Sequence, residues 1–324
     1  MLPAAANEAA DWIVVEAADT DWDYGERPEQ RSVEDRLANG LVIVDKPAGP
    51  QSNQVSVWVK EILDRGKAGH SGTLDPHVTG VLPVGLDRGT KVMRPLSGAG
   101  KEYVCLMRLD EERDTDRVET VAADFIGTVT QLPPDRSAVK QEERDREIYD
   151  LEVLEAEGTA VLFRIEVEKG FYVRTFCRQF GRALDTTGEM AELRRTQVGT
   201  FTEDQTVTLQ DLTDQYAFWQ DGDENDLDDL VLPVEAGVRH LKKVIVKDSA
   251  VAALAHGADL GTGGISRLQT GITEDELVAV LTLKGELVAT AHAGMAADRM
   301  AEGTGTAATL DRVYIQKDVY PQEW

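Results

Sequence analysis

The chain has 324 residues, and its 59 acidic residues outnumber the 34 lysines and arginines, which gives a formal net charge of −25. This balance argues against a basic nucleic-acid coat protein and against a cationic membrane-surface protein, because both attract polyanions with an excess of lysine and arginine. It does not exclude a local basic groove, and a hydrophobic fraction of 42% at this length favours about two folded domains.

The N-terminal third of the sequence predicts an arm followed by a strand, a helix and a loop. The first 40 residues hold ten acidic and three basic residues with little amphipathic period, and we interpret them as an extended arm. Residues 41–44 have the composition of a strand, and apolar side chains recur with helical spacing over 54–64. Residues 66–80 are rich in glycine and polar side chains, which indicates a loop.

The middle of the chain mixes strand and helix patterns, which predicts an α/β domain. Strand-length apolar or alternating runs are followed by a helical apolar face at 173–184. Residues 201–230 carry ten acidic residues and no lysine or arginine, and we interpret them as a solvated connection between domains. From His240 onward, a strand, a short helix and a hairpin pattern around Lys284 and Gly285 indicate a small β-rich domain.

The most unusual segment is GHSGTLDPHVTG at residues 69–80. Its glycines allow tight turns and close approach of a ligand, and the proline after Asp75 holds that residue in an extended conformation. The spacing fits neither a phosphate-binding P-loop nor a dinucleotide-binding fingerprint. Ordinary turn chemistry is one interpretation. The other is that a single accessible carboxylate performs covalent nucleophilic catalysis at an electrophilic carbon.

Cysteine usage and apolar run lengths bear on compartment and cofactors. Cys105 and Cys177 lie among apolar residues, and no Cys/His cluster has the spacing of a metal site. We expect two buried free thiols in a reducing cytoplasm. No apolar stretch approaches the roughly 18 residues of a membrane span, and the N-terminus lacks the basic flank of a signal peptide. The sequence therefore predicts a cytoplasmic protein without metal, cofactor or membrane association.

The basic residues are 12 lysines and 22 arginines. An acid-rich, lysine-poor surface is typical of a protein from a halophile, because concentrated salt screens the repulsion between carboxylates. An acidic protein without salt adaptation is the alternative.

Several segments, in order along the chain, together resemble one family. They are LVIVDKPAGP, GHSGTLDPHVTGVLPVGL, GKEYVCLMRL, GFYVRTFC and MAELRRTQVG. They closely resemble the TruB branch of RNA pseudouridine synthases, and within it the archaeal homologues of dyskerin, the catalytic subunit of box H/ACA ribonucleoproteins. The resemblance implies a mixed α/β catalytic domain with a largely antiparallel sheet at 41–239 and a PUA domain, a small β-barrel, at 240–324. It also implies that the arm at 1–40 packs on the PUA domain.

The resemblance implies three catalytic residues. Asp75 matches the nucleophilic aspartate that engages the target uridine while the glycosidic bond breaks and the base re-attaches through C5. Tyr103 matches a tyrosine that stacks on the flipped base, and Arg174 matches an arginine that pairs with the nucleophile. Attack at C1′, attack at C6 and a route through a sugar intermediate all stay open.

The resemblance also implies substrate-binding residues, each with a structural alternative. His70 matches a histidine that contacts RNA near the extruded nucleotide, with ordinary loop packing as the alternative. Leu193 matches an apolar residue of the pocket, although pocket and core overlap at this position. Lys46 is a candidate for substrate contact, with a structural ion pair as the favoured alternative.

The resemblance of the C-terminal part to a PUA domain implies RNA partners. Gly257, Gly261 and Gly264 would allow close backbone approach to the ACA end of a guide RNA, and purely structural support is the alternative. Further implied partners are transfer RNA or ribosomal RNA as substrate, two small accessory proteins and a kink-turn-binding protein. Residues 135–147 are far more acidic than the basic equivalent expected in relatives, which bears on RNA affinity.

The distribution of charge supports an RNA groove on an acidic body. Residues 60–108 carry a net charge of +3 and residues 164–195 carry +2, whereas the first 40 residues carry −7 and residues 201–230 carry −10. From the resemblance we expect a cofactor-free enzyme that isomerises uridine in guide-selected RNA, in the TΨC loop of transfer RNA, or in both. A non-catalytic RNA-binding scaffold is the alternative.

Overall fold

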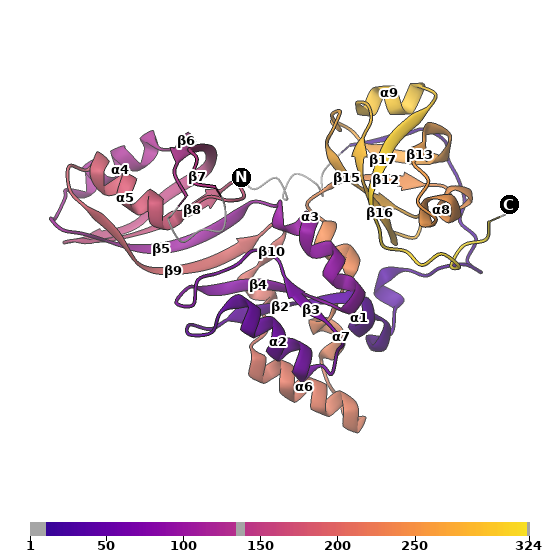
Figure 1. Ribbon diagram of the computed structural model, residues 1–324, viewed down its shortest axis with the longest axis horizontal. Helices are drawn as coiled ribbons and strands as arrows, with labels where there is room; N and C mark the ends of the chain where they lie inside the picture. The colour runs from indigo at the N-terminus through magenta and orange to yellow at the C-terminus, as the bar shows by residue number, and fades with distance from the viewer. Residues whose placement is uncertain (1–10, 134–139, 323–324) are drawn as a thin grey trace.

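Two β-sheets organise the part of the chain that the computed structural model describes, residues 11–133 and 140–322 (Figure 1). The strands of the larger sheet are β2 Gly40–Lys46, β3 Ala68–His70, β4 Thr79–Leu86, β5 Lys101–Leu109, β6 Gly127–Gln131, β7 Arg144–Glu157, β8 Ala160–Val167, β9 Gly188–Val198, β10 Phe201–Thr202 and β11 Leu232–Pro233. Their order is β11-β2-β4-β9-β5-β8-β7-β6, with β3 paired to β4 and β10 to β9. All of these pairings are antiparallel except β4 with β9. The predicted mixed, largely antiparallel sheet is confirmed.

Two helices cover one end of this sheet, α4 Thr115–Asp124 and α5 Val173–Ala183 (Figure 1). The predicted apolar face of α5 is confirmed, because Phe176, Cys177 and Phe180 are fully buried. Phe163 on β8 meets the ring of Phe176 edge to face at 5.7 Å, a favoured arrangement for aromatic pairs. The expected free thiols are also confirmed, with the Sγ atoms of Cys105 and Cys177 3.7 Å apart in this core. The core fixes α5 rigidly against β5 and β9.

A second layer, α2 Ser52–Ile62 and α6 Leu209–Asp221, packs beside β2 and β4 (Figure 1). The interpretation of residues 201–230 as a solvated connection was wrong, because they form β10, α6 and the short α7 Leu227–Leu230. Leu212, Tyr216 and Leu227 are buried in the core shared with α2. The ten acidic residues lie between these apolar positions and concealed their helical period.

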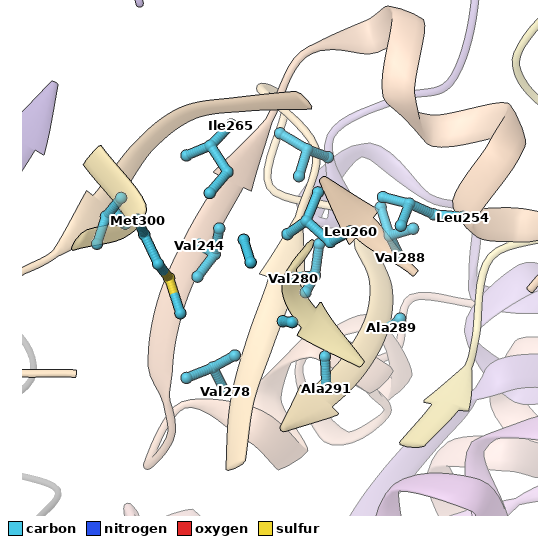
Figure 2. Close-up of a cluster of buried hydrophobic side chains, with 14 of the residues drawn as sticks. Val244, Leu254, Leu260, Ile265, Val278, Val280, Val288, Ala289, Ala291 and Met300 are labelled. Carbon is cyan, nitrogen blue, oxygen red and sulfur yellow. The ribbon is translucent and has the colours of Figure 1, made fainter. Parts of the chain in front are cut away.

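The smaller sheet forms the C-terminal body. Its strands are β12 Lys242–Val246, β13 Leu260–Gly261, β14 Ile265–Gln269, β15 Leu277–Leu281, β16 Leu287–Ala293, β17 Thr306–Val313 and, from the arm, β1 Trp12–Val14. Their order is β1-β14-β12-β15-β16-β17-β13. Figure 2 shows the core of this body, where valine and leucine side chains from facing strands meet small residues such as Ala289 and Ala291. The helices α8 Asp248–Ala255 and α9 Ala297–Glu302 complete it.

The N-terminal arm joins both bodies. Strand β1 pairs with β14, and the buried Lys284 donates to the hydroxyl of Thr20 at 2.7 Å and to the hydroxyl of Tyr320 at 3.1 Å. The arm and the C-terminal tail are thereby fixed to the smaller sheet. Residues 33–39, which we expected to be extended, form the helix α1 Val33–Asn39, and its Leu37 is buried against the larger sheet. The arm's residues 1–10 lie outside the described residues.

The remaining short helices are α3 Met93–Ser97 and the 3-10 turns η1 Pro28–Gln30, η2 Asp87–Val92, η3 Glu203–Gln205, η4 Val234–Val238 and η5 Thr262–Gly264. Part of the acidic stretch at 135–147 also lies outside the described residues, which end at 133 and resume at 140. None of the helices in the described part of the chain is long and apolar enough to cross a membrane.

Candidate active site

Asp75 lies in the loop between β3 and β4, and Arg174 lies in the first turn of α5. Although 99 positions separate them, Nη2 of Arg174 donates to Oδ2 of Asp75 at 3.1 Å. The Asp75 side chain is 62% exposed and the Arg174 side chain is 48% exposed. The pair is therefore accessible to a large substrate, and it is held by helix α5 on one side and by the loop between β3 and β4 on the other.

Helix α2 fixes the backbone of the residue before Asp75. The hydroxyl of Ser52, which is fully buried, accepts from the amide of Leu74 at 2.8 Å and donates to its carbonyl at 3.0 Å. The amide of Gly49 donates to the carbonyl of Pro76 at 2.8 Å. The backbone is thus held on both sides of Asp75.

Lys46 holds the same loop from β2. Its side chain is fully buried, and Nζ donates to the carbonyls of Pro47 at 2.9 Å, Pro76 at 3.1 Å and Val78 at 2.8 Å. Burial lowers the pKa of Lys46. All three acceptors of Lys46 are backbone carbonyls. The expected structural ion pair between Lys46 and a carboxylate is therefore not found among the residues that the structure describes. An ammonium group has three N–H donors, and all three are used here.

Arg195 is a functional candidate that the sequence interpretation missed. It is only 1% exposed, with Nε donating to the carbonyl of Val81 at 2.8 Å and Nη2 to the carbonyl of Gly72 at 3.2 Å. Burial lowers the pKa of Arg195, and the neighbouring Tyr103 opposes that effect. One buried guanidinium therefore links the start of the Asp75 loop, strand β4 and Tyr103.

The glycine at position 80 allows this strand to approach Arg195. Gly80 has a φ of +102°, and a Cβ atom there would lie 2.1 Å from the carbonyl oxygen of Arg195. Neighbouring Arg194 points to the other face of β9, where it pairs with Asp45 at 3.0 Å and with Glu203. Successive residues of a strand face opposite sides, so the pair of arginines in the sequence contained a signal for one buried arginine.

Tyr103 and Leu193 lie on the adjacent strands β5 and β9. Tyr103 is opposite Arg195, and Leu193 is opposite Cys105. Both side chains are partly buried and pack on the core of α5. Tyr103 is thereby brought to Arg195, which also holds the Asp75 loop.

His70 lies at the end of β3, where its Nε2 is 2.9 Å from Oδ1 of Asn53 on α2. Burial, with a further contribution from Arg195, lowers the pKa of His70. The neutral imidazole is therefore favoured. The ring lies beside the loop, and no described hydrogen bond joins it to Asp75.

In the smaller body, two of the three predicted glycines line one cavity. Gly261 and Gly264 border a cavity of about 270 Å³ beside α8, together with Ser249 and Asp259. Gly257 follows α8 with a φ of +93°, a conformation that favours glycine, and it does not line this cavity. Among the described residues, no group of three or more His, Cys, Asp or Glu side chains could hold a metal ion.

Comparisons with known families match most of the chain between residues 2 and 314. Residues 60–173 match the TruB family pseudouridylate synthase N-terminal domain, and residues 174–239 match the tRNA pseudouridylate synthase B C-terminal domain. Residues 242–314 match the PUA domain, and residues 2–56 match the DKCLD domain. The chain belongs to the TruB family of pseudouridine synthases that carry a PUA domain.

Relatives and solved structures place it more narrowly. A probable tRNA pseudouridine synthase B from Methanocaldococcus jannaschii is 48% identical over 98% of this chain and 95% of the relative. The corresponding protein from Methanothermobacter thermautotrophicus is 49% identical over 97% and 98%. The structure of a Cbf5-Nop10-Gar1 complex contains a chain with a TM-score of 0.95 and 46% identity, covering 99% and 98%. An H/ACA ribonucleoprotein bound to a substrate RNA gives a TM-score of 0.92 at 44% identity, covering both chains fully (100% and 100%). Within the family, the chain is of the archaeal Cbf5 type, the relatives of dyskerin.

Proposed function

We propose that the chain isomerises uridine to pseudouridine in RNA with Asp75 as the nucleophilic carboxylate. The observation that carries this assignment is the accessible Asp75–Arg174 pair on a loop held from three sides. In the reaction the bond between N1 and C1′ breaks, the base turns, and C5 bonds to C1′. The C5 proton then leaves and N1 takes up a proton, so that the product is an isomer of uridine. The atoms balance without an oxidant, a metal or a cofactor.

The neighbouring side chains fit this reaction. Arg174 orients the Asp75 carboxylate, because a charge-assisted hydrogen bond is both short and directional. A uridine must leave its stack before either C1′ or C6 is accessible, which costs a few kcal/mol. Stacking on an aromatic ring such as Tyr103 offsets about 1–3 kcal/mol of that cost. Leu193 supplies an apolar wall on the next strand.

Lys46, Ser52 and Arg195 act as positioning residues in this account. Each bonds the backbone of the loop, and none has a described contact with the Asp75 carboxylate. We assign Lys46 this role in place of the predicted substrate contact, because its donors are all used. His70, at the base of the loop, is proposed to contact RNA near the extruded nucleotide.

We further propose that the C-terminal body, which contains the PUA domain, binds the ACA end of a guide RNA at the cavity beside Gly261 and Gly264. Small residues there let a nucleotide approach the backbone, and Gly257 shapes the turn after α8. The likeness to Cbf5 in complexes with Nop10 and Gar1 and with substrate RNA supports partners of those kinds. A kink-turn-binding protein completes the proposed assembly, with ribosomal RNA as the substrate.

Guide-independent modification of transfer RNA is a second candidate, favoured by the names of the full-length relatives. A vestigial scaffold is disfavoured by the joint presence of Asp75, Tyr103 and Arg174 in one arrangement. The proposed domain limits are 41–239 for catalysis and 240–324 for the PUA domain, with the arm at 1–40 bridging them. Two free buried thiols support a reducing, cytoplasmic location.

Tritium release from RNA labelled at uracil C5 tests the proposal, because C5 loses its hydrogen only when it bonds to C1′. The full chain is assayed in high salt on a guide-paired substrate and on naked transfer RNA. Release that requires guide RNA supports the H/ACA role, and release from naked transfer RNA supports the second candidate. No release from either substrate, with RNA still bound, supports the scaffold and contradicts the proposal.

A further inference from the structure

Helix α5 has an unusual charge for this protein. Its eleven residues include three arginines, Arg174, Arg178 and Arg182, and no acidic residue. By contrast, α6 carries three acidic residues and no basic one, in a chain with a net charge of −25. Positive charge is therefore concentrated on the helix that begins at the candidate active site.

The three arginines form one exposed row. They recur every four residues, and all three are exposed, while the opposite face of α5 is buried in the aromatic core. Residues four apart on a helix lie about 6 Å apart along its axis, on the same side. The row therefore extends from the Asp75–Arg174 pair along a rigid support.

Two members of the row have no partner in the described part of the chain. Arg174 bonds Asp75, whereas the side chains of Arg178 and Arg182 make neither a hydrogen bond nor an ion pair there. Polar side chains next to the row bond backbone carbonyls and not these arginines. Gln179 donates to the carbonyl of Thr130 at 2.8 Å, and Arg117 donates to the carbonyl of Ala183 at 3.4 Å. The unpartnered guanidinium groups consequently face solvent.

The row is not explained by the stability of the helix. Like charges four residues apart destabilise a helix, and the helix dipole favours a cation only near the C-terminal end, at Arg182. No acidic side chain on α5 offsets the repulsion around Arg178. An anion supplied from outside the chain would offset it.

We propose that Arg178 and Arg182 bind consecutive phosphates of the RNA strand that carries the target uridine. This inference rests on the proposed function, which places that uridine at Asp75. A strand that leaves Asp75 along α5 presents a phosphate at each nucleotide, and the planar guanidinium group matches phosphate geometry. Such contacts position RNA without reading its sequence. Arg178 and Arg182 would therefore hold the RNA backbone and take no part in the chemical step.

Salt dependence of RNA binding tests the proposal. The probe is a fluorescently labelled RNA hairpin with the uridine of a TΨC loop, and its Kd for the full chain is measured over a series of KCl concentrations. Each lost phosphate contact reduces the slope of log Kd against log salt by roughly 0.7 to 0.9. The variant R178Q/R182Q should therefore lose about 1.4 to 1.8 from that slope. Its tritium-release rate at saturating RNA should stay within about twofold of the wild-type rate, because the row does not touch the reacting atoms.

Two further variants separate the proposal from general effects. R88Q/R299Q is the control. It removes two exposed arginines that lie outside α5 and whose side chains have no described partner, and it should leave the slope unchanged. R178K/R182K keeps the positive charge and should recover most of the slope. A slope as low as that of R178Q/R182Q would show that the loss comes from disturbed local structure and would overturn the proposal. If R178Q/R182Q keeps the wild-type slope of log Kd against log salt, the proposal is overturned. That result is expected if the row binds an acidic protein instead of RNA. An equal loss in R88Q/R299Q overturns the proposal as well. If the slope falls while the wild-type chain releases no tritium, the RNA contact stands and the proposed function fails.

Discussion

The hydroxyl of Ser52 bonds both the amide and the carbonyl of Leu74, the residue immediately before Asp75. These two bonds join the first turn of α2 to the loop that presents the carboxylate, in a place closed to water. The loop is thus positioned by buried neutral and cationic donors, and Asp75 is the acidic residue that it exposes. This arrangement separates the stability of the loop from the chemistry at its tip.

Replacement of Ser52 by alanine should weaken both the fold and the reaction. Both backbone groups of Leu74 lose a buried partner, which costs about 1–3 kcal/mol in the free energy of unfolding. The tritium-release rate at saturating RNA should fall because the carboxylate loses its fixed position. Ser56→Ala is the matched control on the same helix, since the hydroxyl of Ser56 bonds only the carbonyl of Ser52. Equal effects of the two substitutions in urea unfolding would contradict the account.

Neighbouring Arg195 and Arg194 should differ sharply when each is replaced by methionine. Arg195→Met leaves buried carbonyls without a donor and should cost about 3 kcal/mol, because charged donors contribute about 1.5–3 kcal/mol each. Arg194 is 37% exposed beside its carboxylate partners, so Arg194→Met should cost at most about 1 kcal/mol. Chemical unfolding of both variants measures the difference. Similar losses would show that Arg195 does not hold the loop.

Lys101 should make stability depend on pH. It is 6% exposed on β5, and burial, together with Arg195 and Lys169, lowers the pKa of Lys101 to about 7. Between about pH 7 and the ordinary value of 10.5, the unfolded chain binds a proton that the folded chain does not. The free energy of unfolding should therefore rise with pH across this window, by up to about 1.4 kcal/mol per pH unit.

Lys101→Met removes that contribution. Unfolding in urea at pH 7 and pH 10 should show a smaller rise in the variant than in the wild-type chain. Lys243, whose pKa is lowered to about 8 by burial and by Arg239, contributes to both proteins and cancels in the comparison. An identical rise in the two proteins would refute the assignment to Lys101.

The acidic surface should make the fold depend on salt. At a net charge of −25, repulsion between carboxylates is largely screened only when the Debye length falls to about 3 Å, near 1 M salt. The midpoint of thermal unfolding should therefore rise between about 0.1 and 1 M KCl. Sucrose is the control, since it adds no screening. A midpoint that does not change with KCl would support the alternative of an acidic protein without salt adaptation.

Sequence patterns predicted the elements better than their contacts. The resemblance indicated Asp75 and Arg174 and implied that they pair, but no spacing along the chain by itself could show that residues 99 positions apart would meet at 3.1 Å. A strand period of two implied that Arg194 and Arg195 face opposite sides, without revealing which side is buried. The acid-rich composition of α6 concealed an apolar face, because a run of carboxylates resembles a solvated loop. The pairing of β1 with β14 depends on contacts across the whole chain, which local patterns do not encode.

The central claim is that the Asp75 carboxylate carries out the isomerisation. Its most direct measurement is tritium release from C5-labelled RNA by Asp75→Asn, with the Kd for the same RNA determined in parallel. Asn keeps the size of the side chain and can still accept a hydrogen bond from Arg174, but it has no nucleophilic charge. The account predicts that release is lost while the Kd changes by less than about threefold. The Kd should change little because replacing one exposed carboxylate by an amide leaves the other RNA contacts in place. Substantial release by Asp75→Asn would contradict it.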